Sequence, residues 1–453
     1  MGLAGKLLAN SGTRREDLCD PFRTGQEEIL PSLAPSESRP KTASSPDRNA
    51  RTFSRRLRHI SSLFILLPAF LFLLSCGPAP SGTPAQATVY SGSAYPLSGP
   101  TALVSVGGVP WYANTTGNTL VGLVPQTGYS MSGYTPAVTL SNPLTSSFSP
   151  NNYDLSGPVA MTVDLSGNLW VTSQKNNSLV SLSSCFTNSN PFFGYCSLQS
   201  GYLTNLNTPS GIAADPSGNI WVANKGNDTL LRLEPVTCNF SCPTTDYSPY
   251  DSTNYSPTLY CLSGSSCTTM GAGCVLALPS AIASDSNGNI WVLNTSPESL
   301  TEIVGGKVSS CQNFSASELF LDNPVALAPD TSGDLVVANQ GKNSSTDSGS
   351  VVYIPSGCTP GSCTPVVLSG SSMGIDQPVS ASFAPNGDLW VAEAGNSSAT
   401  DMPSGCLSGG ACQPIIYEGT AYPFGTPTSI LAIGQTIWVL GTSALVAITP
   451  SGP

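Results

Sequence analysis

A tryptophan at one position of a repeated segment constrains the fold more than any other feature of this 453-residue chain. Six segments place this tryptophan eleven or twelve residues after a proline, and a seventh segment, which starts at Pro324, carries Val336 instead. All the tryptophans of the protein lie there: Trp111, Trp170, Trp221, Trp291, Trp390 and Trp438. Tandem self-similarity marks a repeat architecture, so we expect seven copies of one structural unit.

Each repeat has the pattern of antiparallel strands joined by tight turns. In the third repeat, the apolar residues 211–214 precede a turn from Asp215 to Asn219, and residues 220–223 form the returning strand. Asp and Gly are turn residues, because Asp accepts hydrogen bonds from following amides and Gly tolerates positive φ. A third strand and a fourth, such as residues 365–368 of the fifth repeat, complete the unit. Four antiparallel strands repeated every ~55 residues are typical of a β-propeller blade, with Trp as a wedge between blades.

The two ends of the repeat region predict how the ring closes. The last repeat supplies only three strands, whereas residues 87–97, before the first repeat, match residues 414–424, before the last one. An N-terminal fourth strand that pairs with the last blade leaves no open sheet edge, so Val89 should lie beside residues 445–448. We therefore expect an all-β fold over residues 87–453: a seven-bladed β-propeller of four-stranded antiparallel blades, closed by pairing an N-terminal strand with the last blade.

The segment before the propeller has the pattern of an export signal. Residues 51–58 contain four arginines and precede an apolar run over residues 60–74, which is too short to cross a ~30 Å hydrocarbon core comfortably. The run ends in Leu-Leu-Ser-Cys-Gly, which resembles the bacterial lipobox and makes Cys76 the lipidation site. The alternative is an ordinary signal peptide that is cleaved nearby, with Cys76 coincidental.

These features divide the N-terminal part into three segments. Residues 51–76 are a predicted lipoprotein-type signal peptide, and the Gly-, Pro- and Ser-rich residues 77–86 are a tether. Residues 1–50 are polar and patternless, so we expect disorder there or a start codon assigned too far upstream. The predicted location is the bacterial cell envelope, at the periplasmic or the outer surface, with the membrane contacted only through the lipid on Cys76.

Cysteine usage agrees with export. Twelve cysteines follow Cys76, and an oxidising compartment favours disulfides between them. Close spacing suggests the pairs Cys185/Cys196, Cys238/Cys242, Cys261/Cys267, Cys358/Cys363 and Cys406/Cys412, with Cys274 and Cys311 left over. The connectivity among the four cysteines between Cys261 and Cys311 stays open. Zinc is disfavoured, because the chain has no Cys-x-x-Cys pair and its one histidine, His59, lies in the leader.

Charge excludes one class of partner. Eleven of the 16 basic residues lie within the first 60 residues, which leaves five basic and 20 acidic residues in the rest of the chain. A domain so acidic repels phosphate backbones, so nucleic acid is not an expected partner. A protein or carbohydrate ligand fits better, and we expect a monomer.

Residues at the end of the second strand form the candidate binding set. Three positions after the tryptophan, the repeats carry Asn114, Ser173, Asn224, Asn294, Asn339 and Glu393. One interpretation is that these side chains cap the strand end. The other is a polar ring around the channel mouth, which binds a neutral or glycan-like ligand.

Two further features have a structural and a functional interpretation. The turn aspartates, Asp215 among them, could be calcium ligands, but capping of one turn in each blade explains them without an ion. The insertion over residues 234–274 carries four tyrosines, which suit a protein or carbohydrate contact or pack within the insertion itself. No metal or other cofactor is indicated.

The segment Pro-x-Gly-Ile…Gly-Asn-Ile-Trp-Val resembles NHL repeats and, through its tryptophan, the repeats of virginiamycin B (streptogramin) lyases, over residues 87–449. The resemblance implies the propeller. For a lyase it would also imply a metal-assisted ring-opening elimination with a catalytic histidine, and the predicted propeller contains no histidine. A gluconolactonase-like activity would need a carboxylate or amide metal site on the axis, where the first strands carry mostly Ala, Gly, Ser, Ile and Leu.

These observations lead to one prediction and one alternative. We expect an exported, lipid-anchored propeller that serves as a binding or scaffold module for a protein or glycan-like ligand, without streptogramin lyase activity. The alternative is a lactonase- or lyase-type enzyme with a non-histidine, possibly metal-dependent site at the channel mouth.

Overall fold

The structure is a computed structural model that describes residues 6–7, 85–125, 134–135, 139–141, 155–183, 197–202, 205–237, 253–342, 348–410 and 412–450. All of them belong to one compact unit, which comprises Met1–Ser11 and Thr83–Pro453. Cys76 and the predicted signal peptide and most of the tether lie outside the described residues. No helix in the described part of the chain is long and apolar enough to span a membrane.

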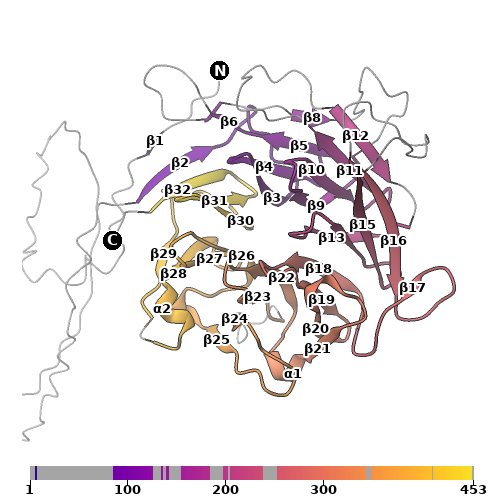
Figure 1. Cartoon of the computed structure of the whole chain (residues 1–453). Helices are drawn as coiled ribbons and strands as arrows, with labels where there is room; N and C mark the ends of the chain where they lie inside the picture. The colour runs from indigo at the N-terminus through magenta and orange to yellow at the C-terminus, as the bar shows by residue number, and fades with distance from the viewer. Residues whose placement is uncertain are drawn as a thin grey trace, which may run out of the picture. The chain divides into compact units, whose positions relative to one another are not determined.

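The unit is a seven-bladed β-propeller of four-stranded antiparallel sheets, as predicted (Figure 1). Blade 1 contains β3 (Pro100–Val106), β4 (Val109–Asn114), β5 (Thr119–Gly122) and β8 (Thr139–Ser141). Blade 2 contains β9 (Pro158–Val163), β10 (Leu169–Ser173), β11 (Ser178–Ser183) and β12 (Ser197–Tyr202). Blade 3 contains β13 (Pro209–Ala214), β14 (Ile220–Asn224), β15 (Thr229–Thr237) and β16 (Thr253–Cys261). Blade 4 contains β18 (Pro279–Ser284), β19 (Ile290–Thr295), β20 (Glu298–Ile303) and β21 (Cys311–Ser315).

The remaining blades continue the same order. Blade 5 contains β22 (Pro324–Pro329), β23 (Leu335–Asn339), β24 (Ser350–Ile354) and β25 (Val366–Ser369). Blade 6 contains β26 (Pro378–Phe383), β27 (Leu389–Glu393), β28 (Ser398–Met402) and β29 (Ile415–Tyr417). Blade 7 contains β30 (Pro427–Ile433), β31 (Thr436–Gly441), β32 (Leu445–Thr449) and β2 (Gln86–Tyr90).

Several short strands and turns lie outside the four-stranded blades. Strand β1 (Lys6–Leu7) pairs with β2, β17 (Thr268–Thr269) pairs with β16, and β6 (Val124–Pro125) pairs with β7 (Tyr134–Thr135). The helices are two single turns, α1 (Ala316–Leu319) and α2 (Ser404–Leu407), and the 3-10 turns η1 (Val304–Gly306) and η2 (Ser371–Met373). Lys6–Leu7 is thus a paired strand within the segment for which we expected disorder or a start codon assigned too far upstream, and residues 8–50 lie outside the described part.

The predicted closure is confirmed. Strand β2 pairs antiparallel with β32, and Val89 lies opposite Val446. The first strands of neighbouring blades contact one another around the ring, and β3 of blade 1 contacts β30 of blade 7. The N-terminal strand therefore covers the sheet edge that blade 7 would otherwise expose.

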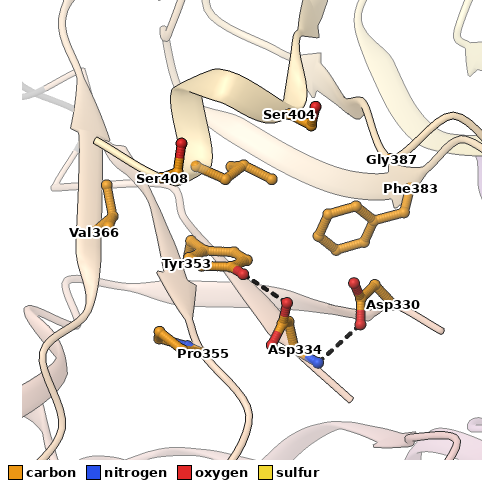
Figure 2. A pocket seen from close by; sticks show the side chains of 10 residues that line it. Asp330, Asp334, Tyr353, Pro355, Val366, Phe383, Gly387, Ser404 and Ser408 are labelled. Atoms are coloured by element: carbon orange, nitrogen blue, oxygen red, sulfur yellow. Dashed lines mark hydrogen bonds between the residues drawn. The ribbon is translucent and has the colours of Figure 1, made fainter. Parts of the chain in front are cut away.

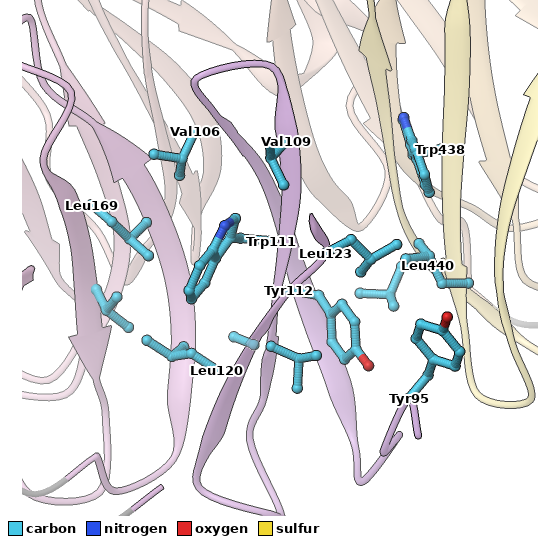
Figure 3. Close-up of a cluster of buried hydrophobic side chains, with 14 of the residues drawn as sticks. Tyr95, Val106, Val109, Trp111, Tyr112, Leu120, Leu123, Leu169, Trp438 and Leu440 are labelled. Carbon is cyan, nitrogen blue, oxygen red and sulfur yellow. The ribbon is translucent and has the colours of Figure 1, made fainter. Parts of the chain in front are cut away.

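The core consists of apolar clusters between successive blades, with the repeat tryptophan in each interface that has one. Trp170 of blade 2 packs against Ile212 and Ile220 of blade 3, and Trp291 of blade 4 packs against Leu335 of blade 5. Figure 3 shows the cluster where Trp111 lies near Leu169 of blade 2. The tryptophans therefore act as the wedges between blades that the sequence predicted.

Four disulfides are present among the described residues, and three of them are predicted close pairs: Cys261–Cys267, Cys358–Cys363 and Cys406–Cys412. Cys274 pairs with Cys311, with Cα atoms 4.9 Å apart, which settles the open connectivity. Disulfides in this number are typical of extracellular or periplasmic proteins. Cys185, Cys196, Cys238 and Cys242 lie outside the described residues, so their pairing stays a prediction.

In the described part of the tyrosine-rich insertion, β15 and β16 pair antiparallel within blade 3. Tyr260 stacks on Trp221 of its own blade, and Tyr255 contacts Trp170 of blade 2 edge-on. These two rings pack inward, as in the structural interpretation. Tyr247 and Tyr250 lie outside the described residues.

Candidate functional site

The turn between the first two strands anchors the tryptophan of blades 2, 3 and 4 by the same hydrogen bonds. In blade 3, Asp215 Oδ1 accepts from the amides of Ser217 and Asn219, each at 2.9 Å. Asp215 Oδ2 accepts from Asn219 Nδ2 at 2.7 Å and from the indole Nε1 of Trp221 at 2.9 Å. The corresponding carboxylates, Asp164 and Asp285, make the same four bonds. Capping of the turn and of the indole therefore occupies both carboxylate oxygens.

Blade 5 departs from this arrangement at two positions. Val336 replaces the tryptophan, and Asp334 replaces the asparagine of the turn. Asp330 Oδ1 still accepts from the amides of Ser332 and Asp334, at 2.7 and 2.8 Å, so the turn itself is intact. Neither Val336 nor an ionised Asp334 has a side-chain N–H group to offer. Asp330 Oδ2 thus loses both donors that its counterparts have.

A cavity of about 420 Å³ lies at this point, between blades 5 and 6. Its carboxylates and one aromatic ring come from blade 5, with Asp330 and Asp334 facing Tyr353 (Figure 2). Blade 6 contributes the ring of Phe383 and the turn α2. The remaining lining residues are Pro355, Val366, Gly387, Ser404, Leu407 and Ser408.

The cavity lies beside the turn of the blade that lacks the indole. In each sheet the residue opposite the tryptophan lies on the third strand, and Tyr353 occupies this place opposite Val336. In blade 4 the indole of Trp291 fills the interface with the next blade. Val336 is 0% exposed and does not line the cavity, whereas Tyr353, opposite it, does.

Two carboxylates and a phenol set the electrostatics of the cavity. The Tyr353 hydroxyl donates to Asp334 Oδ2 at 2.6 Å, and the Ser356 amide donates to Asp334 Oδ1 at 2.7 Å. Burial, this hydrogen bond and the charges of both aspartates raise the pKa of Tyr353 far above its ordinary value, so the phenol stays protonated. Among the described residues that line the cavity there is no Lys, Arg or His.

A disulfide fixes the blade 6 wall. Turn α2 carries Ser404 and Leu407 to the cavity, and Cys406 within it is buried and bonded to Cys412. The Ser404 amide donates to Asp388 Oδ1 at 2.9 Å, which ties the wall to the turn of its own blade. The predicted disulfide is therefore also a support of the candidate site.

The six predicted ring residues occupy equivalent places, but they are not exposed at a channel mouth. Asn114, Ser173, Asn224, Asn294, Asn339 and Glu393 are each 0% exposed. Asn224 shows the reason: its Oδ1 accepts from the Asn207 amide at 3.2 Å, while its Nδ2 donates to the Asn205 carbonyl at 2.9 Å and to Thr229 Oγ1 at 3.0 Å. Asn114 and Asn294 make the matching bonds. All six side chains are thus buried, and Asn114, Asn224 and Asn294 cap the loop that enters their blade, as in the capping interpretation.

Glu393 is the one acidic member of that set. Its Oε2 accepts from the Asp376 amide at 2.9 Å, and its Oε1 is buried without a partner among the described residues. Burial raises the pKa of Glu393 to about 8; the hydrogen bond from the Asp376 amide lowers this pKa, and the Asp376 charge raises it. With no exposed surface, this carboxyl cannot contact a substrate in the described conformation.

None of the residues that line the cavity was predicted as a site residue from the sequence. The signal was present, since blade 5 keeps the turn aspartate but has Val336 and Asp334 in place of the tryptophan and the asparagine. What the sequence did not show is that the turn aspartate and the tryptophan, six residues apart, are hydrogen-bonded partners. Unless this hydrogen bond is known, the absence of the tryptophan does not indicate that the turn aspartate has lost a hydrogen-bond donor.

Among the residues that the structure describes, no group of three or more His, Cys, Asp or Glu side chains is placed to hold a metal ion. The two carboxylates of the cavity fall short of such a group.

Comparison with known proteins defines the class of fold. No family model and no curated protein sequence matches the chain. Among solved structures, the chain resembles a catalytically inactive variant of virginiamycin B lyase from Staphylococcus aureus bound to quinupristin, in which a histidine is changed to alanine. The TM-score is 0.53 and the identity 16%, over 81% of this chain and 99% of that one.

Two other solved structures give the same result. A streptogramin B lyase structure is 15% identical with a TM-score of 0.53, over 82% of this chain and 99% of that chain. A protein from Lactobacillus plantarum is 11% identical with a TM-score of 0.50, over 82% of this chain and 96% of that chain. The chain therefore has the propeller fold that virginiamycin B lyases also have.

Proposed function

We propose that this protein is an exported, lipid-anchored binding module whose ligand lies in the cavity between blades 5 and 6. The observation that carries the proposal is that blade 5 keeps the turn aspartate, Asp330, while Val336 and Asp334 stand in place of the tryptophan and the asparagine. Beside the turn of this blade lies a cavity of about 420 Å³, and Asp330 Oδ2 lacks the two donors that its counterparts have. Apolar walls with a few convergent polar groups are the usual composition of a ligand site.

Two features support an exported module. Disulfides join Cys274 to Cys311 and Cys406 to Cys412, and disulfides persist in oxidising compartments. The lipobox-like sequence that ends at Cys76 supports attachment through a lipid. Fractionation of expressing cells tests the anchor: the full chain should appear in the membrane fraction, and the Cys76→Ser variant should not. Equal recovery of both proteins in the membrane fraction would refute the anchor.

The ligand site is tested with a variant that refills the cavity. In this refilled variant, Val336→Trp, Asp334→Asn and Tyr353→Ser together give blade 5 the residues that blade 2 has at Trp170, Asn168 and Ser181. A panel of peptides and oligosaccharides is screened against the wild-type chain and the refilled variant by calorimetry. Binding by the wild type that the refilled variant loses supports the proposal, and binding by both proteins alike would contradict it.

A lactonase- or lyase-type activity with a non-histidine site is the second candidate. The fold shared with virginiamycin B lyase and the two carboxylates of the cavity favour it. That lyase is inactive when one of its histidines is replaced by alanine, whereas the only histidine here, His59, precedes the propeller. Turnover of a lactone panel, with and without divalent cations, tests this candidate, and loss of that turnover in Asp330→Asn would locate the activity in the cavity.

A further inference from the structure

From the same cavity we infer the chemical class of the ligand: a guanidinium group, presented as an arginine side chain by a partner protein. This inference rests on the proposed function, because it assumes that the cavity is the ligand site. It derives from the indole and amide donors that blades 2 to 4 place beside the turn carboxylate and that blade 5 lacks.

The first step is the geometry of the missing donors. Asp164 Oδ2 and Asp215 Oδ2 each accept from two nitrogen donors, one indole and one amide, at 2.7 to 2.9 Å. Asp330 Oδ2 has neither donor in the described structure, and Figure 2 shows this carboxylate beside the cavity with its other oxygen bonded to the Asp334 amide. Guanidinium offers N–H donors from two nitrogens in a fixed fork. It can therefore supply both missing bonds.

The second step is charge. Asp334 brings a second carboxylate where the other turns have a neutral amide, and its oxygens are held by Tyr353 and Ser356. The lining residues include no cation to balance the two carboxylates. A cationic ligand gains from both charges, whereas a neutral saccharide leaves them uncompensated. The repeat region as a whole, with five basic and 20 acidic residues after residue 60, attracts a basic partner at long range.

The third step is shape. The rings of Tyr353 and Phe383 come from different blades and face the same cavity. A planar cation stacks on aromatic faces, and arginine does so more readily than lysine. Ser404 and Ser408 add hydroxyl acceptors from α2 for further N–H groups. Carboxylate, aromatic walls and hydroxyls together favour guanidinium over the compact ammonium of lysine.

Three capped tripeptides with one changed residue test the inference. Their central residue is arginine, lysine or citrulline, which has the shape of arginine without its charge, and calorimetry measures their binding to the full-length chain. The arginine peptide should bind at least ~10-fold more tightly than the citrulline peptide, because hydrogen bonds between charged partners are about twice as strong as neutral ones. Asp330→Asn should remove most of this preference, since asparagine keeps the turn acceptor but not the charge.

The control is Asp215→Asn, the same change in a turn whose carboxylate is covered by Trp221. It should leave arginine binding as in the wild type. Equal binding of the arginine and citrulline peptides overturns the guanidinium inference, and so does binding of an oligosaccharide alone. In either case the proposed function still stands if the refilled variant loses the binding that the wild type shows. Arginine binding that the refilled variant retains, or no binding of any probe by the wild type, overturns both.

Discussion

Tyr90 stacks on Trp438, with ring centroids 5.6 Å apart and an interplanar angle of 29°. The two residues come from opposite ends of the propeller sequence. The same contact, between a second-strand tryptophan and a fourth-strand aromatic residue, occurs within single blades: Trp221 with Tyr260, Trp291 with Phe314 and Trp390 with Tyr417. Strand β2 thus takes the place of a fourth strand in its side-chain packing as well as in its register.

This relationship predicts a large cost for removing the N-terminal strand. Deleting residues 77–97 should lower the free energy of unfolding far more than deleting residues 1–50, because it opens the ring and removes Tyr90. The single change Tyr90→Ala should cost about 3 kcal/mol, as expected for a buried aromatic ring. Urea unfolding measures each effect, and equal losses from the two deletions would contradict the closure.

The second prediction concerns the disulfide beside the cavity. The pair of changes Cys406→Ala and Cys412→Ala should lower stability by about 2 kcal/mol, since a short loop constrains the unfolded chain only modestly. It should also weaken ligand binding, because α2 carries Ser404 and Leu407 to the cavity. Removing Cys261–Cys267 of blade 3, which closes a loop of the same length away from the cavity, is the matched control and should cost similar stability without losing binding. Free thiols at these four positions in secreted protein, found by non-reducing peptide mapping, would refute both parts.

The third prediction is a loss of stability at alkaline pH. Burial is the main cause that raises the pKa of Glu393 to about 8 and the pKa values of Glu302 and Asp401 to about 7. A carboxyl whose pKa is raised by folding contributes its full stability below its ordinary pKa, and this contribution is lost as the pH rises through the raised value. The free energy of unfolding should therefore fall between about pH 5 and pH 9.

The variant Glu393→Gln isolates the largest of these contributions to the pH dependence of the free energy of unfolding. Glutamine fits nearly the same space and offers an N–H donor at every pH, so the variant should lose less stability between about pH 6 and pH 9 than the wild type. Chemical unfolding at several pH values provides the comparison. A steeper pH dependence in the variant would show that Glu393 is ionised in the folded protein at neutral pH.

The fourth prediction is the absence of streptogramin lyase activity. An elimination needs a proton acceptor near neutral pH, for which histidine is the usual side chain, and the repeat region has none. Glu393 has a suitable pKa but is 0% exposed. Purified protein incubated with virginiamycin B and magnesium should leave the ring closed, as followed by mass spectrometry. Ring opening that Glu393→Gln abolishes would refute this reading of the site.

The fold could be predicted from the sequence because the same pattern recurs in each repeat and can be compared between repeats. The recurring tryptophan fixed the number of blades, and the match of residues 87–97 to residues 414–424 placed Val89 opposite Val446. The connectivity of Cys274 and Cys311 needed the structure, since the order of cysteines along a chain does not determine which of them meet.

The candidate site was less accessible from the sequence, for two physical reasons. Polar residues at a strand end, such as Asn224, look alike whether they face a ligand or cap a loop, and only burial distinguishes the two cases. The cavity is lined by Asp330, Tyr353 and Phe383 among others, which belong to two blades and become neighbours through packing. A sequence shows the departure from the repeat, but not the space and the carboxylate that the departure uncovers.

The central claim is that blade 5 lacks the indole that donates to the turn carboxylate in blades 2 to 4. The refilled variant, with Val336→Trp, Asp334→Asn and Tyr353→Ser, tests this claim most directly. The measurement is its thermal unfolding midpoint beside that of the wild type. We predict a higher midpoint, because the indole fills the interface with blade 6 and both donors to Asp330 Oδ2 are restored, at the expense of binding. A midpoint equal to or below that of the wild type would contradict the account.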